Sequence, residues 1–280
     1  MTGRTLALGF SPCPNDTFIF DALVNGRVDT GALRFEPVLE DVETLNRWAL
    51  QGRLDVTKIS YGALPLVAKD YLLLDSGGAM GRGVGPLLVA RPDRAALRPE
   101  TATVAIPGEH TTAHLLFSLA YPEVVRKRFI PFSEIEEAVR GGAVDAGVLI
   151  HEGRFTYQAK GLVKLVDLGE HWEAVTGSPI PLGGIVARRS LGAQVAREVD
   201  RLIRESVEQA LGAYPRITDY VERHAQELDP AVMRRHVELY VNDFSVGMGE
   251  AGRSAVRRLI EVHARTWPGG EPLPEEIFLG

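Results

Sequence analysis

Short apolar runs alternate with polar loops and amphipathic segments along the first two thirds of the chain. Runs rich in branched and aromatic residues predict strands, and segments with apolar side chains every three or four positions predict helices. From about Ala193 onward the pattern is helical. This order is typical of an α/β protein with mainly parallel sheets. We expect strands at residues 5–10, 33–39, 54–59, 103–106 and 144–150.

The two halves of this region repeat one plan. A strand, a proline-containing loop and a helix begin at Leu6 and again at Val104. Further on, a helix, a glycine and an apolar strand lead to Ser60 in one half and to His151 in the other. The repeat predicts two similar α/β lobes around a central cleft. Ligands of open α/β sheets bind beyond the carboxyl ends of the strands, where Ser60 and His151 are expected.

The chain of 280 residues is longer than most single domains, which favours two lobes of ordinary size. The proline-rich and charged segment Arg91–Arg94 is the expected crossing into the second lobe. A predicted strand at Gly183–Ala187 returns towards the first lobe. We therefore expect a discontinuous first lobe of residues 1–90 and 188–280, and a second lobe of residues 91–187.

Composition narrows the classes of partner. The formal net charge is -6, and no block of basic residues marks a surface for nucleic acid or for an anionic membrane. A small molecule is the expected partner, and the oligomeric state is left open. The single cysteine, Cys13, and the lack of a long apolar segment favour a reduced, cytoplasmic location.

His151 is the main candidate for chemistry, because it ends a seven-residue apolar strand and precedes a polar segment. An imidazole at a strand end can accept a proton near neutral pH, since its ordinary pKa is about 6.5. The alternative is a histidine that only closes the edge of the sheet. A metal role is less consistent with the sequence, because the zincin pattern needs a histidine where Phe155 stands.

Other motifs for metals and nucleotides are incomplete. His110 and His114 are four residues apart, the spacing of a metal pair on a helix, but no cysteine lies nearby to complete the site. The glycine cluster 77–85 does not match the dinucleotide fingerprint, because Pro86 occupies the third required position. We expect no metal and no nucleotide cofactor, and we interpret the glycines as a wall near the cleft or the hinge.

Two predicted helices begin with residues suited to an anion. Asn15 and Asp16 in one half, and Thr111 and Thr112 in the other, follow a strand and open a helix. Unpaired N–H groups and a partial positive charge let such helix ends hold a carboxylate or phosphate. Simple capping of each helix is the alternative. Four more residues complete the candidate cleft: Lys58, Ser60, Ser11 and Arg154.

Seven segments carry a resemblance to a known family. Together they resemble the 1,4-dihydroxy-6-naphthoate synthases of the futalosine route to menaquinone, and the resemblance runs from about Leu6 into the C-terminal helices. Combined motifs of this length are far more specific than any single one. The segments are Gly9–Phe20, Leu39–Asn46, Thr57–Tyr61, Gly81–Pro86, Pro107–Thr112, Ile150–Tyr157 and Tyr240–Ser245.

The resemblance implies a type II periplasmic-binding-protein-like fold and a carbon–carbon lyase without a cofactor. The implied substrate is the carboxylate cyclic dehypoxanthinylfutalosine, and the products are 1,4-dihydroxy-6-naphthoate and a small sugar-derived ketone. Transferred by position, His151 is the proton acceptor, and the substrate-binding residues are Lys58, Ile59, Ser60, Thr111 and Thr112. Alternatives on the same architecture are a solute-binding protein without catalysis and the related chorismate dehydratase.

Overall fold

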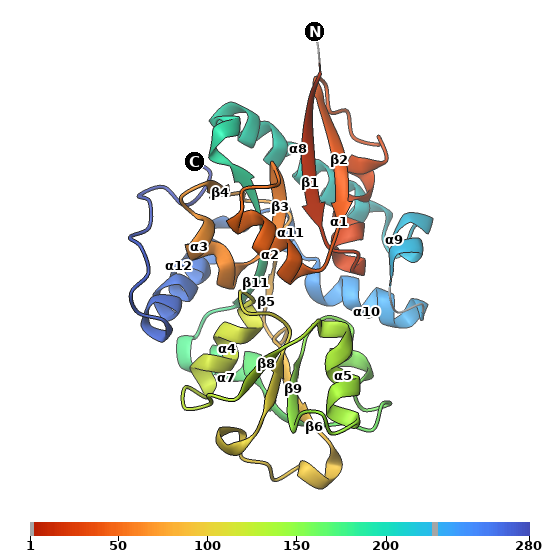
Figure 1. Cartoon of the computed structure of the whole chain (residues 1–280). Coiled ribbons are helices and arrows are strands. Elements are labelled where there is room, and N and C mark those ends of the chain that lie inside the picture. Colours follow the sequence, from red (N-terminus) through yellow and green to blue (C-terminus); the bar gives the residue numbers. More distant parts are fainter. Residues whose placement is uncertain (1–2, 226–228) are drawn as a thin grey trace.

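Two β-sheets lie one above the other in the computed structural model, which describes residues 3–225 and 229–280 (Figure 1). The first, six-stranded sheet has the order β2-β1-β3-β11-β4, with β5 paired to β11. Its strands are β1 (Arg4–Phe10), β2 (Leu33–Leu39), β3 (Val56–Ser60), β4 (Tyr71–Leu73), β5 (Ala79–Gly81) and β11 (Ile180–Arg188). The second, five-stranded sheet has the order β10-β6-β9-β7-β8. Its strands are β6 (Leu87–Ala90), β7 (Val104–Ile106), β8 (Lys127–Phe129), β9 (Ala146–Leu149) and β10 (Val163–Asp167).

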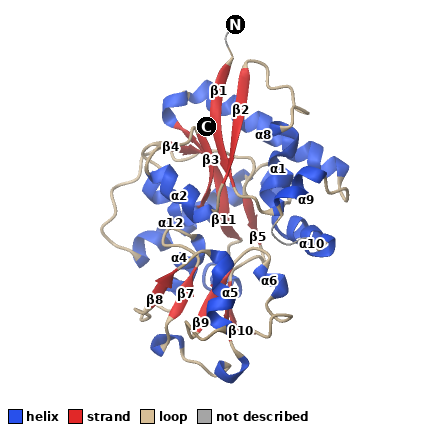
Figure 2. Ribbon diagram, turned by 45° about the vertical axis from the view of Figure 1, so that its right-hand side comes forward, coloured by secondary structure: helices blue, strands red, loops and turns tan. Residues whose placement is uncertain are grey.

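Helices cover both sheets, and they are seen around the red strands in Figure 2. Those before the return to the first sheet are α1 (Pro14–Val24), α2 (Val42–Leu50), α3 (Leu64–Val67), α4 (Thr112–Ala120), α5 (Phe132–Arg140), α6 (Gly153–Thr156) and α7 (Leu168–Thr176). Those after it are α8 (Ala193–Ala213), α9 (Asp219–His224), α10 (Pro230–Tyr240), α11 (Asp243–Val246) and α12 (Gly249–Thr266). Short 3₁₀ turns are η1 (Tyr61–Ala63), η2 (Pro92–Arg94), η3 (Pro99–Thr101) and η4 (Arg189–Leu191). Within the described ranges, no helix combines the length and apolar character needed to cross a bilayer.

Strand β11 shows how the first sheet separates two apolar cores. Successive side chains of a strand point to opposite faces of the sheet. Ile185 and Ala187 accordingly pack in the core that contains α1 and α8, whereas Val186 packs in the core that contains α12. The predicted helical C-terminal region thus covers the first sheet on both faces.

Both sheets are mixed, although the sequence predicted mainly parallel ones. Strand β1 is parallel to β2 and β3, and β7 is parallel to β8 and β9. Strand β11 is antiparallel to β3, β4 and β5, while β6 is antiparallel to β9 and β10. Strands β6 and β11 are each the first strand after a passage between the two sheets.

The strand pairing moves both predicted crossing points. Residues 87–90 belong to the second sheet and residues 180–188 to the first, so the first passage precedes Leu87 and the second precedes Ile180. Sequence reasoning placed the first crossing at Arg91 because proline and charge mark an exposed segment, but that segment is a surface turn beyond β6. We retain the discontinuous division into two lobes as a proposal, with these corrected boundaries.

Two helices near the cleft, α1 and α10, begin at a proline. Helix α10 begins with Asp229 as N-cap and Pro230 in its first turn, the pattern typical of a helix start. Helix α1 begins two or three residues earlier than it would if Asn15 or Asp16 were its N-cap, the alternative given for these residues in the sequence. Its N-cap is Cys13, because Pro14 already has the φ angle of a first helical residue and needs no N–H partner. The Asp16 side chain is therefore free for another role.

Close backbone contact at the first passage predicts a strong effect of one added methyl group. A Cβ atom on Gly85 would lie 2.3 Å from Gly169 Cα, which is backbone and cannot turn aside. We expect Gly85→Ala to lower the free energy of unfolding in urea by about 1–3 kcal/mol. The matched control is Gly212→Ala in α8, where a Cβ meets nothing within 4 Å. It should raise stability by up to about 1 kcal/mol through helix propensity, and equal effects at both sites would contradict the packing argument.

Candidate active site

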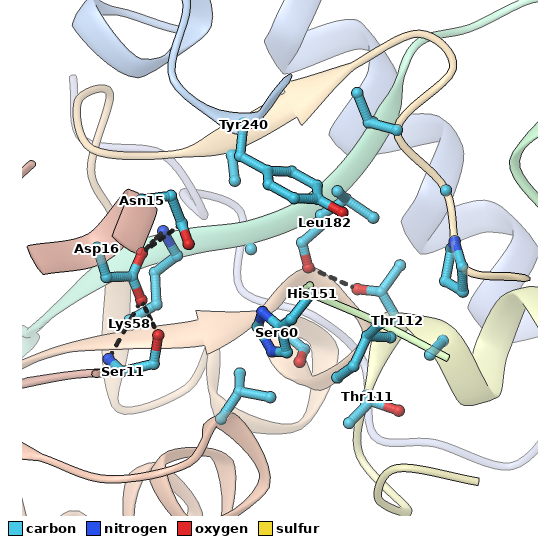
Figure 3. Close-up of a pocket in the computed structure, with 18 residues that line it drawn as sticks. Ser11, Asn15, Asp16, Lys58, Ser60, Thr111, Thr112, His151, Leu182 and Tyr240 are labelled. Carbon is cyan, nitrogen blue, oxygen red and sulfur yellow. Dashed lines mark hydrogen bonds and ion pairs between the residues drawn. The ribbon is translucent and has the colours of Figure 1, made fainter. Parts of the chain in front are cut away.

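A cavity opens where the carboxyl ends of strands from the two sheets face each other (Figure 3). It contains about 660 Å³ of space free of protein atoms, part of which is open to solvent. Ser60 at the end of β3 and His151 shortly after β9 both line it, as the internal repeat predicted. Its apolar walls include Val42, Ala79, Val84, Pro86, Ala113, Ile150, Leu182 and Tyr240. The cavity thus combines largely apolar walls with a few polar groups.

A buried ion pair lies on one side of this cavity. Lys58 Nζ is 2.7 Å from Asp16 Oδ1, and the two side chains are only 5% and 3% exposed. The second carboxylate oxygen of Asp16 accepts hydrogen bonds from the Ser11 hydroxyl at 2.7 Å and from its backbone N–H at 3.2 Å. Asn15 Nδ2 donates to Asp16 Oδ1 at 2.8 Å. Both Asp16 oxygens are thus paired, and Lys58 reaches the cavity with its charge compensated.

Ile59 occupies the opposite face of β3 from Lys58 and Ser60. Side chains alternate along a strand, so the two polar neighbours reach the cavity while Ile59 points away from it. Ile59 is fully buried and packs in the apolar core with Tyr61 and Leu64. The side chain of Ile59 therefore does not reach the cavity, and the assignment of this residue to substrate binding stays a prediction, because a position taken from a continuous motif does not distinguish the two faces of the strand.

Ser60 is oriented by Asn46, a residue that the sequence did not single out. Asn46 Oδ1 accepts the Ser60 backbone N–H at 2.8 Å, and Asn46 Nδ2 donates to Ser60 Oγ at 3.2 Å. Because Ser60 Oγ accepts this bond, its own hydrogen is available to a ligand in the cavity. Asn46 is fully buried in the middle of α2, and a polar amide among the apolar positions of this amphipathic helix was the available signal in the sequence.

Thr111 and Thr112 both line the cavity, but their hydroxyls are engaged within the protein. Thr111 Oγ1 donates to Gly108 O at 2.9 Å and accepts the His114 N–H, so it caps α4. Thr112 Oγ1 donates to Leu182 O at 2.9 Å and accepts the N–H of Gly62 at 3.0 Å. What α4 offers a ligand is its first backbone N–H groups, which have no partner inside a helix.

His151 has an unusual backbone conformation. Its φ angle of 55° lies in the left-handed region, which costs a residue other than glycine about 1–3 kcal/mol. The conformation turns the chain between β9 and α6 and places the ring against Phe132, with the ring centroids 4.8 Å apart. Strained residues held in place by their surroundings are concentrated at functional sites.

The His151 ring lacks a hydrogen-bond partner at one of its nitrogens. Its Nε2 atom is buried, and no residue in the described part of the chain forms a hydrogen bond with it. Burial lowers the pKa of His151 below its ordinary value, although the nearby carboxylates of Glu152 and Asp16 oppose this effect. A neutral imidazole with an unpaired nitrogen is suited to accept a proton from a bound molecule.

Arg154 lies outside the cavity. Its guanidinium pairs with Asp167 Oδ2 at 2.8 Å and also donates to Gly85 O. Asp167 is the N-cap of α7, so the pair joins α6 to the start of α7. This corrects the assignment of Arg154 as a cleft residue, since its charge is satisfied by a buried carboxylate of its own lobe. Gly85 itself lines the cavity, which agrees with the interpretation of the glycine cluster as a wall.

A second polar contact bridges the two lobes beside the cavity. His110 Nδ1 lies 2.8 Å from Glu43 Oε1, and the His110 backbone N–H donates to Glu43 Oε2 at 3.1 Å. Asn46 Nδ2 donates to His110 O at 3.3 Å. Glu43 and Asn46 are on α2, whereas His110 precedes α4. The hydrogen bond to Glu43 raises the pKa of His110 above its ordinary value.

His114 does not pair with His110. Its Nδ1 contacts Glu109 O at 2.8 Å, and its ring packs beside Phe129 and Trp267. Burial lowers the pKa of His114 to about 4. Within residues 3–225 and 229–280, no group of three or more histidine, cysteine or acidic side chains is placed to hold a metal ion.

Comparison with known proteins shows which family this site belongs to. Residues 6–265 match a protein family described as menaquinone biosynthesis. The chain is 53% identical over 272 residues to the 1,4-dihydroxy-6-naphthoate synthase of Thermus thermophilus, covering 97% of this chain and 98% of the relative. It is 50% identical over 265 residues to the synthase of Streptomyces coelicolor, covering 93% of each. The chain belongs to this synthase family. It is therefore an enzyme of menaquinone biosynthesis, and the lyase class predicted from the sequence is consistent with the family.

Solved structures confirm the fold expected for a synthase of this family. A crystal structure from Archaeoglobus fulgidus has a TM-score of 0.87 at 35% identity and covers 93% of this chain and 97% of its own. The ligand-binding component of a Staphylococcus aureus ABC-type importer has a TM-score of 0.69 at 10% identity, covering 98% and 96%. An alkanesulfonate-binding protein of Xanthomonas axonopodis pv. citri has a TM-score of 0.66 at 15% identity, covering 100% and 97%. The last two likenesses concern the fold alone, which is periplasmic-binding-protein-like.

The contact between Glu43 and His110 predicts a pH-dependent term in the stability of the synthase. A raised histidine pKa contributes stability that is fully present below the unfolded value of about 6.5 and is lost as pH rises through the folded pKa. A double-mutant cycle with Glu43→Gln and His110→Gln, followed by urea unfolding, should give a favourable coupling at pH 5.5 that is weaker at pH 8.5. A coupling independent of pH would show that the pair is not ionic.

Proposed function

We propose that this synthase converts cyclic dehypoxanthinylfutalosine to 1,4-dihydroxy-6-naphthoate and a small sugar-derived ketone, with His151 as general base. One observation carries the proposal: His151 lines the cavity in a strained turn, with Nε2 buried and without a hydrogen-bond partner among the described residues. The family relationship supplies the reaction class, since two relatives at 50–53% identity bear the synthase name.

The proposed reaction is a redox-neutral fragmentation. His151 removes a proton from a hydroxyl group or another acidic position of the sugar-derived ring. The carbon–carbon bond then breaks, a carbonyl group forms on the leaving fragment, and the electron pair of the broken bond enters the ring system that becomes aromatic. His151 then returns the proton to one of the two products, which regenerates the neutral imidazole. Because the burial of His151 keeps the imidazole neutral at physiological pH, the base is ready before substrate binds.

The substrate carboxylate requires an anchor at the opposite end of the cavity from the ion pair. Ser60 has a hydroxyl hydrogen available, and the first N–H groups of α4, at Thr112 and Ala113, carry the positive end of the helix dipole. Lys58 adds less than expected from the sequence, because Asp16 neutralises its charge. We therefore assign carboxylate binding to Ser60 and the α4 backbone, with the hydroxyls of Thr111 and Thr112 shaping the helix end.

Contact between the lobes supports water exclusion during the reaction. Thr112 joins Gly62, in the turn η1 that follows β3, to the start of α4, and a Cβ atom on Gly62 would lie 2.9 Å from the Thr111 backbone. The bonds of Asn46 and Glu43 to His110 add to this junction. Closing the lobes around a substrate would align it with the base and remove competing water.

Replacement of His151 tests the base assignment. We expect His151→Ala to lower kcat by about 10²–10⁴-fold, because a positioned base contributes that much, while substrate binding measured by calorimetry is retained. His151→Asn is the matched control for the backbone, since asparagine also tolerates the left-handed conformation but cannot accept a proton near neutral pH. Normal turnover by either variant would contradict the assignment. Wild-type protein that binds the substrate without converting it would favour the solute-binding alternative.

Replacement of Ser60 tests the carboxylate anchor. A hydrogen bond to a charged group contributes about 1.5–3 kcal/mol, so Ser60→Ala should raise KM by roughly 10–100-fold with a smaller change in kcat. Ser133→Ala, on the exposed surface of α5, is the control and should leave both constants unchanged. A drop in kcat without a change in KM would place Ser60 at the reacting end of the substrate instead.

A further inference from the structure

His236 contacts the proposed base and has no assigned role. It lies on the buried face of α10, and its ring is parallel to that of His151, with 5° between the planes and 6.1 Å between the centroids. His236 is fully buried, and its Nδ1 atom has no hydrogen-bond partner in the described part of the chain. Two histidines from distant parts of the sequence thus form a stacked pair beside the cavity.

The hydrogen bonds around His236 determine which of its nitrogens carries the proton. Lys58 and Asn15 Nδ2 both donate to Asp16 Oδ1. The amide nitrogen of Asn15 must face this carboxylate, so its oxygen faces His236, where Nε2 lies 2.9 Å from Asn15 Oδ1. An amide oxygen only accepts, so Nε2 of His236 is the protonated nitrogen and Nδ1 of the neutral ring is bare.

The stacked pair spans the cleft. Helix α10 packs on α1, which supplies Asn15, and both belong to the part of the chain that covers the first sheet. His151 instead follows β9 of the second sheet. The two rings therefore come from different lobes and meet at the boundary between them, so the first lobe supplies one wall of the site around His151.

We propose that His236 is a positioning residue for the base: its ring, fixed in one orientation and tautomer by Asn15, stacks on His151 across the cleft, holds that imidazole in place and covers one of its faces. This inference rests on the proposed role of His151. The ion pair of Lys58 and Asp16, acting through Asn15, fixes the orientation of His236. His236 in turn excludes water from one face of His151.

The charges around the pair agree with two neutral rings. His151 is influenced by Glu152, Asp16, Lys58 and Asp41, and burial outweighs their combined effect in lowering its pKa. Burial is also the main cause of the lowered pKa of His236, and the second cause is its neighbour His151. Other groups packed against His236 include the rings of Tyr240 and Phe155, with centroids 4.7 and 6.4 Å away, and the amide of Asn15.

Two variants of His236 separate the ring from its hydrogen bond. His236→Gln keeps an N–H where Nε2 stands but removes the ring, so water reaches His151. We expect the acid limb of the pH profile of kcat/KM to move to higher pH, and kcat to fall on the order of 10–100-fold through misalignment of the base. His236→Phe keeps the ring but not the donor, so the acid limb should stay close to its wild-type position. The control is His224→Gln on α9, a histidine that packs on Tyr220 away from the cavity, and it should leave the profile unchanged.

Nitrogen NMR on the wild-type protein tests the inference without turnover. The His236 ring should show a protonated Nε2 and a bare Nδ1 from pH 5.5 to 8, and the His151 resonance, assigned with His151→Asn, should titrate at higher pH in His236→Gln. A protonated Nδ1 on His236, or an acid limb and His151 titration that are the same in wild type and His236→Gln, would overturn the proposal. Absence of turnover in the wild type would refute the proposed function, while the NMR result would still decide the relation between the two rings.

Discussion

The buried ion pair between Lys58 and Asp16 is the contact on which the site depends. Both side chains are almost fully inaccessible, and removal of one partner from such a pair typically costs about 3–5 kcal/mol because the other charge is left without compensation. The pair joins strand β3, which carries Lys58, to the first turn of α1, which carries Asp16. Through Asn15 it also orients His236. The same contact therefore joins β3 to α1 and fixes the direction of the hydrogen bonds that lead to the proposed base.

The sequence predicted the parts of the site that follow from strand direction. The carboxyl ends of parallel strands lie at the same edge of a sheet, so the sequence alone placed Ser60 and His151 at a common cleft. The two-lobed α/β fold was predicted from the same repeat. Residues such as Asn46 and His236 could not be predicted in this way. Each is a single polar residue on an otherwise apolar helix face, and its partner is distant in sequence: Asn15 and His236 are 221 positions apart.

The corrected predictions have a common physical origin, because local sequence does not reveal which face or which sheet a residue joins. Ile59 lies inside a motif of polar cavity residues, yet strand alternation directs it into the core. Arg154 follows the catalytic candidate closely, but its charge is paired with Asp167. The strand 87–90 precedes the predicted crossing in sequence, yet pairs in the second sheet. All three assignments require long-range pairing, which a single sequence does not contain.

Burial imposes a compromise on the proposed base. A lower pKa makes His151 a weaker proton acceptor, but it also keeps the imidazole deprotonated at physiological pH, so almost every enzyme molecule is competent. A weak base suffices when the electron pair released by the broken bond completes an aromatic ring, because that gain in stability drives the step forward. A strained turn holding a neutral imidazole against a second neutral imidazole suits such a reaction. It would suit a reaction that needs a strong base much less well.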